Sequence, residues 1–381
     1  MSLTFYPPQK PDELNARQKA KSLYETWILP TALEDDRNAL YRTDVFKTFA
    51  QAGLVALGVP KEFGGGGQSY RCHYGVIEEL AKGPIAFSVS IAVTNLVMGG
   101  ILAFGNETQK KTLLPKLTSG EWLGAFSLSE PQSGSDAAGL RLKAEKVNGG
   151  YSLTGTKCWC SSGGDADIYL VMGRTGEHKT KGITSFLVQK NTSGFKIGKK
   201  ENKMGLKASA LTELVFENCF VPESQRLGKE GDGYLVALSQ LDAGRIGIGA
   251  CGTGLATAAI ERMQRELKGD FGNHCAFKEA IAEKFSEHYA KLQAVKSLIT
   301  LASELKDQNQ DIKILASHIK LLGSDLAMEV SHDIVHFLGE RGAQEEEQVE
   351  RFFRDAKALQ IVEGTNQIQK WVIAREMEKM V

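Results

Sequence analysis

The spacing of apolar residues changes twice along this chain of 381 residues, and this change limits the folds it can adopt. Up to about residue 120, apolar residues recur every three or four positions among charged ones, as in amphipathic helices. From Glu121 the period shortens to two, in short β-branched or aromatic runs divided by Gly, Asn and Asp, which is typical of strands. From Gly231 the helical period returns over longer stretches. The sequence therefore predicts an α+β fold with three domains: residues 1–120, 121–228 and 229–381.

Individual elements follow from the same patterns. We expect helices in the first domain over residues 12–27, 32–52, 74–81 and 107–117, and strands in the second over 151–155, 168–172, 183–188 and 211–220. In the third domain, long helices are expected around 281–299 and 312–337, followed by an amphipathic helix over 367–380. Such long helices favour an antiparallel helical bundle.

Composition excludes several classes of partner. The 46 basic and 46 acidic residues balance, so neither nucleic acid nor an anionic membrane is expected as a partner. We find no apolar run of membrane-spanning length and no targeting signal over Met1–Lys10, which predicts a cytoplasmic protein or, less favoured, one of the mitochondrial matrix. The six scattered cysteines suit reduced thiols, and Cys158-Trp159-Cys160 lacks the spacing and partners of a zinc site, so no metal is expected.

Two glycine-rich stretches each allow two interpretations. Gly64–Gly67 could cradle a phosphate, but no Lys-Ser/Thr follows, and a plain turn is the favoured interpretation. Gly247–Gly252 matches G-x-G-x-x-G, which would suggest a nicotinamide dehydrogenase only inside a βαβ unit. Because only helical patterns follow, we favour a helix whose small residues allow close approach of another backbone or a ligand.

The segment Ile361–Gln367 places one carboxylate, Glu363, directly before Gly364. Thr365 or Asn366 can cap the next helix, with Gln369 at capping-box spacing from Asn366. From spacing alone the segment is either a helix–turn–helix junction with a solvated glutamate, or a turn where glycine admits a ligand beside the carboxylate.

Seven motifs, in the right order, resemble those of the acyl-CoA dehydrogenases. The stretch Trp122–Asp136 is similar to the family signature, whose usual form ends T/S-E-P-x-A-G-S-D. The other six are Lys157–Ser162, Lys203–Lys207, Phe216–Pro222, Leu241–Arg245, Phe271–Gly272 and Ile361–Gln367. The resemblance implies an N-terminal all-α domain, a central small β-barrel and a C-terminal four-helix bundle, with FAD between the barrel and the bundle.

The resemblance also implies where FAD binds. Residues expected around the flavin are Phe126, Leu128, Ser129, Ser135, Trp159 and Ser161, joined by Thr365, Asn366 and Gln367 beside Glu363. Without the resemblance, Trp159 in a strand would more often be a core residue. The pyrophosphate and adenosine end, which the family shares across subunits, is expected at Lys268, Phe271, His336 and Gly339.

That adenosine end departs from the family pattern. Lys268 stands where an arginine is usual, which keeps the charge but loses the bidentate fork, and His336 replaces a glutamine. Glu340 replaces a glycine and brings a carboxylate toward the phosphates, which should weaken binding unless it turns away or pairs with Lys268. The flavin site is therefore predicted more firmly than the adenosine site.

By the resemblance, Glu363 is the base that removes the α-proton of an acyl-CoA thioester while the β-hydrogen leaves as hydride to flavin N5, giving the trans-2-enoyl thioester. Its amide and a flavin ribityl hydroxyl would hold the thioester oxygen, and burial would raise its pKa. The alternative base position of the family is occupied here by Gly244. Residues expected to contact substrate are Ser135, Tyr234, Asp242, Arg245 and Gly364, although Asp242 and Arg245 could instead form a surface i,i+3 pair.

The resemblance implies a homodimer or homotetramer and an electron-transferring flavoprotein as acceptor, docking near Trp159. Two alternatives remain. One is an acyl-CoA oxidase-like enzyme or a dehydrogenase of a carrier-bound acyl thioester. The other is a non-catalytic assembly or binding protein derived from the family.

Overall fold

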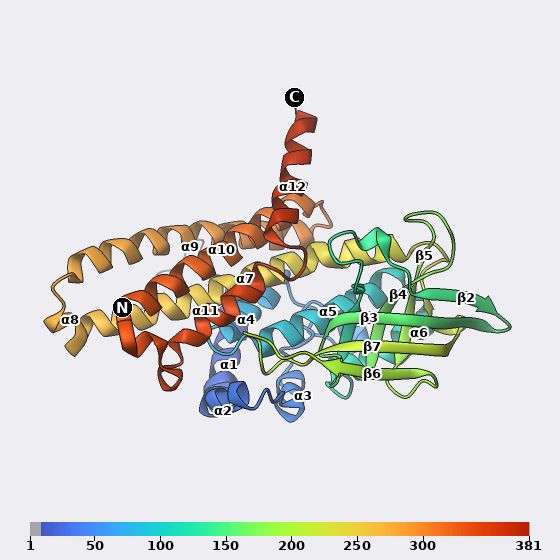
Figure 1. The fold of residues 1–381 in the computed structure, drawn as a ribbon, viewed down its shortest axis with the longest axis horizontal. Helices are drawn as coiled ribbons and strands as arrows, with labels where there is room; N and C mark the ends of the chain where they lie inside the picture. The colour runs from blue at the N-terminus through green and yellow to red at the C-terminus, as the bar shows by residue number, and fades with distance from the viewer. Residues whose placement is uncertain (1–8, 381) are drawn as a thin grey trace.

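The computed structural model describes residues 9–380 and arranges them in the three expected parts (Figure 1). The first part is helical. Its helices are α1 (Pro11–Trp27), α2 (Ala32–Arg37), α3 (Thr43–Gln51), α4 (Tyr70–Leu80), α5 (Ala86–Phe104) and α6 (Glu107–Thr118). The single helix expected over 32–52 is broken into α2 and α3, and α5 was not anticipated.

Helix α5 is central to the fold because it is apolar on nearly every side. It packs against α4, α6 and α7 and against the first strand of the sheet. Its 19 residues are long and apolar enough for a membrane span, so the expectation of no such run was wrong. However, 72% of its most apolar window is buried inside the protein, as in the core helix of a globular domain. Uniform hydrophobicity leaves no helical period, which is why the pattern missed it.

The second part is one eight-stranded sheet, in the hydrogen-bonded order β6-β7-β3-β2-β4-β5-β8, with β1 parallel to β4. The strands are β1 (Gly124–Ser127), β2 (Lys143–Val147), β3 (Gly150–Ser161), β4 (Ile168–Arg174), β5 (Ile183–Gln189), β6 (Phe195–Lys200), β7 (Leu211–Pro222) and β8 (Arg226–Leu227). The four expected strands correspond to β3, β4, β5 and β7. The other four are short or half exposed, so they lack a clear alternating pattern.

The third part comprises α7 (Gly233–Lys268), α8 (Asp270–His274), α9 (Lys278–Asp307), α10 (Lys313–Leu338), α11 (Val349–Leu359) and α12 (Asn366–Met377). Helices α7, α9, α10 and α11 form the bundle, and α12 projects from it (Figure 1). The glycine-rich stretch lies inside α7, which confirms the helical interpretation. A Cβ on Gly252 would lie 2.3 Å from the backbone oxygen of Gly323 in α10, so this glycine allows the two helices to touch.

The four-glycine run forms a tight turn. The N–H groups of Gly65, Gly66 and Gly67 all donate to backbone carbonyls of residues 56–60. Because these amides are already satisfied, they are not free to hold a phosphate, which favours the plain-turn interpretation.

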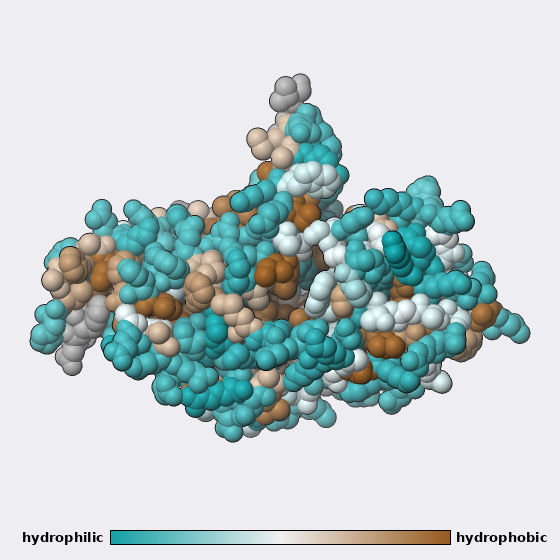
Figure 2. All heavy atoms as spheres, in the orientation of Figure 1, coloured by the Kyte–Doolittle hydropathy of each residue, from teal (hydrophilic) through white to brown (hydrophobic). Residues whose placement is uncertain are grey.

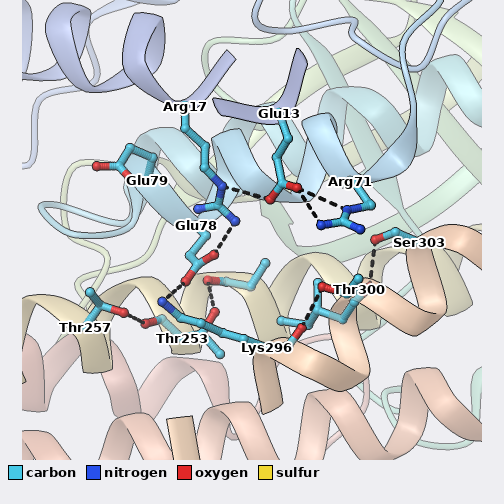
Figure 3. Close-up of polar contacts among 12 residues, drawn as sticks. Glu13, Arg17, Arg71, Glu78, Glu79, Thr253, Thr257, Lys296, Thr300 and Ser303 are labelled. Carbon is cyan, nitrogen blue, oxygen red and sulfur yellow. Dashed lines mark hydrogen bonds and ion pairs between the residues drawn. The ribbon is translucent and has the colours of Figure 1, made fainter. Parts of the chain in front are cut away.

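Helix α1 is fixed to the body by buried ion pairs (Figure 3). Arg17 of α1 and Lys296 of α9 both contact the carboxylate of Glu78 in α4, at 2.7 and 2.6 Å. Burial acts to raise the pKa of Glu78, but these two cations outweigh it and hold the pKa at about 2. The network joins the first and third parts of the chain.

Candidate active site

Glu363 lies in the turn between α11 and α12, where the backbone takes an unusual course. Glu363 and Gly364 both have left-handed backbone angles, with φ of 55° and 85°. For a residue other than glycine, this conformation persists only where surrounding contacts enforce it. The Thr365 hydroxyl accepts from the N–H of Ile368 at 3.3 Å, so Thr365 is the cap of α12.

The carboxyl group of Glu363 rests on the backbone of α7 at Gly244. A Cβ on Gly244 would lie 2.7 Å from Oε2 and 2.9 Å from Oε1, so only glycine leaves room for the carboxyl group. Oε2 is buried and has no hydrogen-bond partner among the described residues. Burial raises the pKa of Glu363 to about 7, against the opposing influence of Arg245 and Lys320. The interpretation of Glu363 as a solvated surface glutamate is therefore wrong.

Arg245 supplies positive charge beside this carboxyl group. Its side chain is buried and pairs with Asp242 at 2.8 Å, so it is not part of a surface pair. Burial raises the pKa of Asp242, which Arg245 opposes. Tyr234 is half-buried in the first turn of α7, about 15 Å before Gly244 along the helix axis. Its contact with substrate stays a prediction.

Three side chains for which the sequence predicts no anchoring role hold the Glu363 turn in place. The amide nitrogen of Gln369 donates to the carbonyls of both Glu363 and Gly364, at 3.2 and 3.0 Å. Asn366 is buried and bonded to α10, where Lys320 donates to its Oδ1 at 2.6 Å. Lys320 lies on the apolar face of α10. A lysine within a stripe of apolar residues is the one sequence signal that could have suggested its anchoring role.

Six of the residues expected around the flavin lie on β1, on β3 or in the segment that follows β1, whereas Thr365, Asn366 and Gln367 lie at the start of α12. The N–H of Cys158 donates to the carbonyl of Ser129 at 3.0 Å, which joins the 126–135 stretch to the end of β3. Trp159 has a φ of 54° and lies where the β3–β7 register shifts. This bulge leaves its side chain 51% exposed, so the interpretation of Trp159 as a core residue is wrong. Phe126, Ser129 and Ser161 are half-buried, Leu128 is buried and Ser135 is exposed.

A buried ion pair supports this surface from behind. Lys157 Nζ contacts Glu130 at 2.8 Å, and the second carboxylate oxygen of Glu130 accepts from the N–H of Arg141 at 2.6 Å. Burial acts to raise the pKa of Glu130, and Lys157 and the backbone N–H groups together lower it. Both residues lie within the quoted motifs, but their structural role could not be read from the sequence.

The residues expected at the adenosine end lie far from Glu363 in the same chain. Lys268 ends α7, about 36 Å from Gly244 along the axis, and His336 lies about 24 Å beyond Lys320 along α10. His336, Gly339 and Glu340 are exposed, as is Lys268, and no ion pair joins Lys268 to Glu340 among the described residues. Phe271 lies in α8, and its side chain falls outside the described part of the structure.

Comparison with known proteins defines the class of this fold and site. Residues 10–121, 125–219 and 231–378 match the models for the N-terminal, middle and C-terminal domains of acyl-CoA dehydrogenases. An acyl-CoA dehydrogenase of Bacillus subtilis is 38% identical, covering 96% of this chain and 97% of its own. The class is that of oxidoreductases.

Solved structures of similar fold support the same class. Butyryl-CoA dehydrogenase of Megasphaera elsdenii superposes with a TM-score of 0.94 at 34% identity, covering 97% of this chain and 98% of its own. A chain in a structure of the electron transferring flavoprotein of Acidaminococcus fermentans gives 0.95 at 31%, covering 97% and 99%. The chain belongs to the acyl-CoA dehydrogenase family, whose members depend on FAD.

Proposed function

We propose that this protein catalyses the FAD-dependent α,β-dehydrogenation of an acyl-CoA thioester to the trans-2-enoyl-CoA, with Glu363 as the base. The observation that carries the proposal is the Glu363 carboxyl group, whose Oε2 is buried and unpaired among the described residues and whose pKa burial raises to about 7. A general base is most effective when its pKa lies near the working pH.

Glu363 would supply two groups to the reaction. Its carboxylate would take the α-proton, and its backbone N–H makes no hydrogen bond among the described residues, so it is available to the thioester oxygen. An N–H aimed at an oxygen that gains negative charge stabilises the transition state. Gly364 keeps the wall thin beside this N–H, and Gln369 holds the turn that carries it by donating to the two carbonyls that follow, those of Glu363 and Gly364. Asp242 and Arg245 would orient the thioester.

The residues at β1 and β3 fit a flavin. A large aromatic side chain held half-exposed by a strained backbone, as at Trp159, is explained if a ring stacks on it. Ser129, Ser135, Ser161 and Thr365 supply hydroxyl groups for the polar edge of such a ring. When bound, FAD would accept the β-hydrogen as hydride.

The separation between the two ends of the expected FAD site supports a homodimer or homotetramer. Residues about 36 Å apart along α7 cannot all contact one FAD in the same chain, so Lys268 and His336 would serve the FAD of a neighbouring subunit. Helix α12 also projects from the body with Trp371 exposed, and Figure 2 shows apolar side chains gathered where it leaves the bundle. Both features support an assembly of several copies.

We propose an electron-transferring flavoprotein as acceptor, because Trp159 is exposed and a closely similar chain occurs in a structure of such a flavoprotein.

Anaerobic bleaching of the purified flavoprotein by butyryl-CoA tests the proposal. We expect reduction of bound flavin, and in Glu363→Gln retained FAD with reduction at least ~10²-fold slower. Near-normal reduction by the variant would remove Glu363 from the mechanism. Turnover with oxygen alone would indicate an oxidase, and a protein that takes up no FAD would indicate a binding or assembly role.

A further inference from the structure

A lysine is fully buried in the bundle behind Glu363. Lys320 of α10 has no exposed surface. Lysine is almost never fully buried unless its charge is compensated, because an ammonium group loses its hydration there. No step of the proposed reaction involves this residue directly.

The ammonium group of Lys320 is bonded to the turn that carries Glu363. It donates to Oδ1 of Asn366 at 2.6 Å, and the Asn366 amide donates to Oδ1 of Asp325 at 2.6 Å. Gln360, at the other end of the turn, donates to the same Asp325 oxygen at 2.6 Å. The Asn366 N–H also donates to the Gln360 carbonyl at 3.0 Å, which closes the turn. Both ends of the turn are thus fixed to α10.

The charge of Lys320 lies beside the turn that carries Glu363. No carboxylate forms an ion pair with Lys320 among the described residues, and the charged groups that influence it are Glu363, Asp325 and Arg245. Arg245 is already paired with Asp242, and Asp325 already accepts from two amides. Hydrogen bonds from amides leave the charge of Asp325 in place, so Glu363 and Asp325 are the two carboxylates that balance this cation. In agreement, burial lowers the pKa of Lys320 to about 7, and Glu363 is the largest influence opposing that.

We propose that Lys320 is a positioning residue for the proposed reaction: through Asn366 it holds the Glu363 turn, and its positive charge favours the ionised form of the Glu363 carboxyl group. The inference rests on the proposed role of Glu363 as base. It adds that the ionisation of this base is set from α10, by a side chain that touches neither substrate nor flavin.

Removing the charge tests the proposal. In Lys320→Met, the pKa of Glu363 should rise by about 1 or more, because a nearby opposite charge lowers a carboxyl pKa by that order. Lys320→Arg keeps the charge and should stay near wild type. Lys296→Met is the matched control, because Lys296 is another buried bundle lysine but pairs with Glu78. It should reduce stability without moving the pKa of Glu363.

The readout is the titration of Glu363 itself, by infrared difference spectra of FAD-free protein with and without Glu363→Gln. In the FAD-loaded enzyme, the midpoint of the pH dependence of flavin reduction by butyryl-CoA should move upward by the same amount. If Lys320→Met does not fold, Lys320→Gln removes the same charge while keeping a donor for Asn366.

Two results would overturn the inference: an unchanged Glu363 titration in the Met and Gln variants, or a rate that falls equally at every pH with no change of midpoint. The second would show a purely structural lysine. Failure of the proposed function is distinguishable, because Glu363→Gln would then reduce flavin normally, whereas the titration in FAD-free protein would still report on Lys320.

Discussion

Gly244→Ala should separate activity from stability in this protein. The new methyl carbon would lie 2.7 Å from Oε2, 2.8 Å from Cδ and 2.9 Å from Oε1 of Glu363. Carbon and oxygen normally stay about 3.3 Å or more apart, so the carboxyl group must move by about 0.5 Å or more. Because a displacement of about 1 Å can cost a factor of about 10² in rate, we expect flavin reduction to slow by about 10- to 100-fold.

The same substitution should leave the helix intact or improve it. Alanine is favoured over glycine inside a helix by about 1 kcal/mol, which offsets part of the cost of moving Glu363. Gly247→Ala, one turn further along α7, is the matched control. Its Cβ would lie 3.6 Å from the Cβ of Ala92, an ordinary contact, so this variant should gain the helical preference without disturbing Glu363.

The assay is rapid anaerobic mixing of the FAD-loaded variants with butyryl-CoA, with thermal unfolding measured in parallel. We expect a slow but stable Gly244→Ala and a wild-type rate in Gly247→Ala. A wild-type rate in Gly244→Ala would refute the reasoning, because the carboxyl group could then shift without consequence. Equal slowing in both variants would also refute it, since the effect would not come from contact with Glu363.

Three further predictions follow from the ion pairs and from the Glu363 carboxyl group. Glu78→Gln should lower the unfolding free energy by about 3–5 kcal/mol in denaturation experiments, because it removes the buried negative charge that Arg17 and Lys296 share. Glu217→Gln breaks an exposed pair of the same 2.6 Å length and should cost under about 1 kcal/mol, so equal losses would contradict this reasoning. Because burial raises the folded-state pKa of Glu363 from 4.5 to about 7, the protein should lose stability as pH rises through that range. In thermal melts, FAD-free Glu363→Gln should therefore be more stable than wild type at pH 8 by up to about 3 kcal/mol, and equal to it near pH 4.5. Glu130→Gln should weaken FAD binding by about 10-fold or more in fluorescence titrations, because Lys157 then loses its charged partner beneath the expected flavin surface. Unchanged FAD affinity would show that the Lys157–Glu130 pair does not support this surface.

The order of the three parts was predictable because it depends on local periodicity. Amphipathic helices such as α9 and half-buried strands such as β7 show their period directly in the sequence. Helix α5 does not, because it is buried on all sides, and short strands such as β8 offer too few residues for alternation. A helix buried on nearly every side and very short strands therefore escaped prediction.

The candidate site was predictable in part. Resemblance to the family located Glu363, Trp159 and Arg245, but it gave no reason for Lys320 or Gln369. Lys320 bonds Asn366, which lies 46 residues further along the chain. Gln369 bonds the Glu363 turn from within the helix that follows it. A hydrogen bond between distant segments leaves no periodic trace in a sequence.

The sequence by itself determined the α+β order of the chain, the turn that carries Glu363, and the presence of glycine at position 244, where a side chain would meet the Glu363 carboxyl group. Tertiary structure alone decided that the Glu363 carboxyl group is buried against Gly244, that its pKa lies near 7, and that the Trp159 ring is exposed. The physical reason is that desolvation and Coulomb interactions depend on distances through space. The segments that set those distances here, α7, α10 and the turn before α12, meet only in the folded protein.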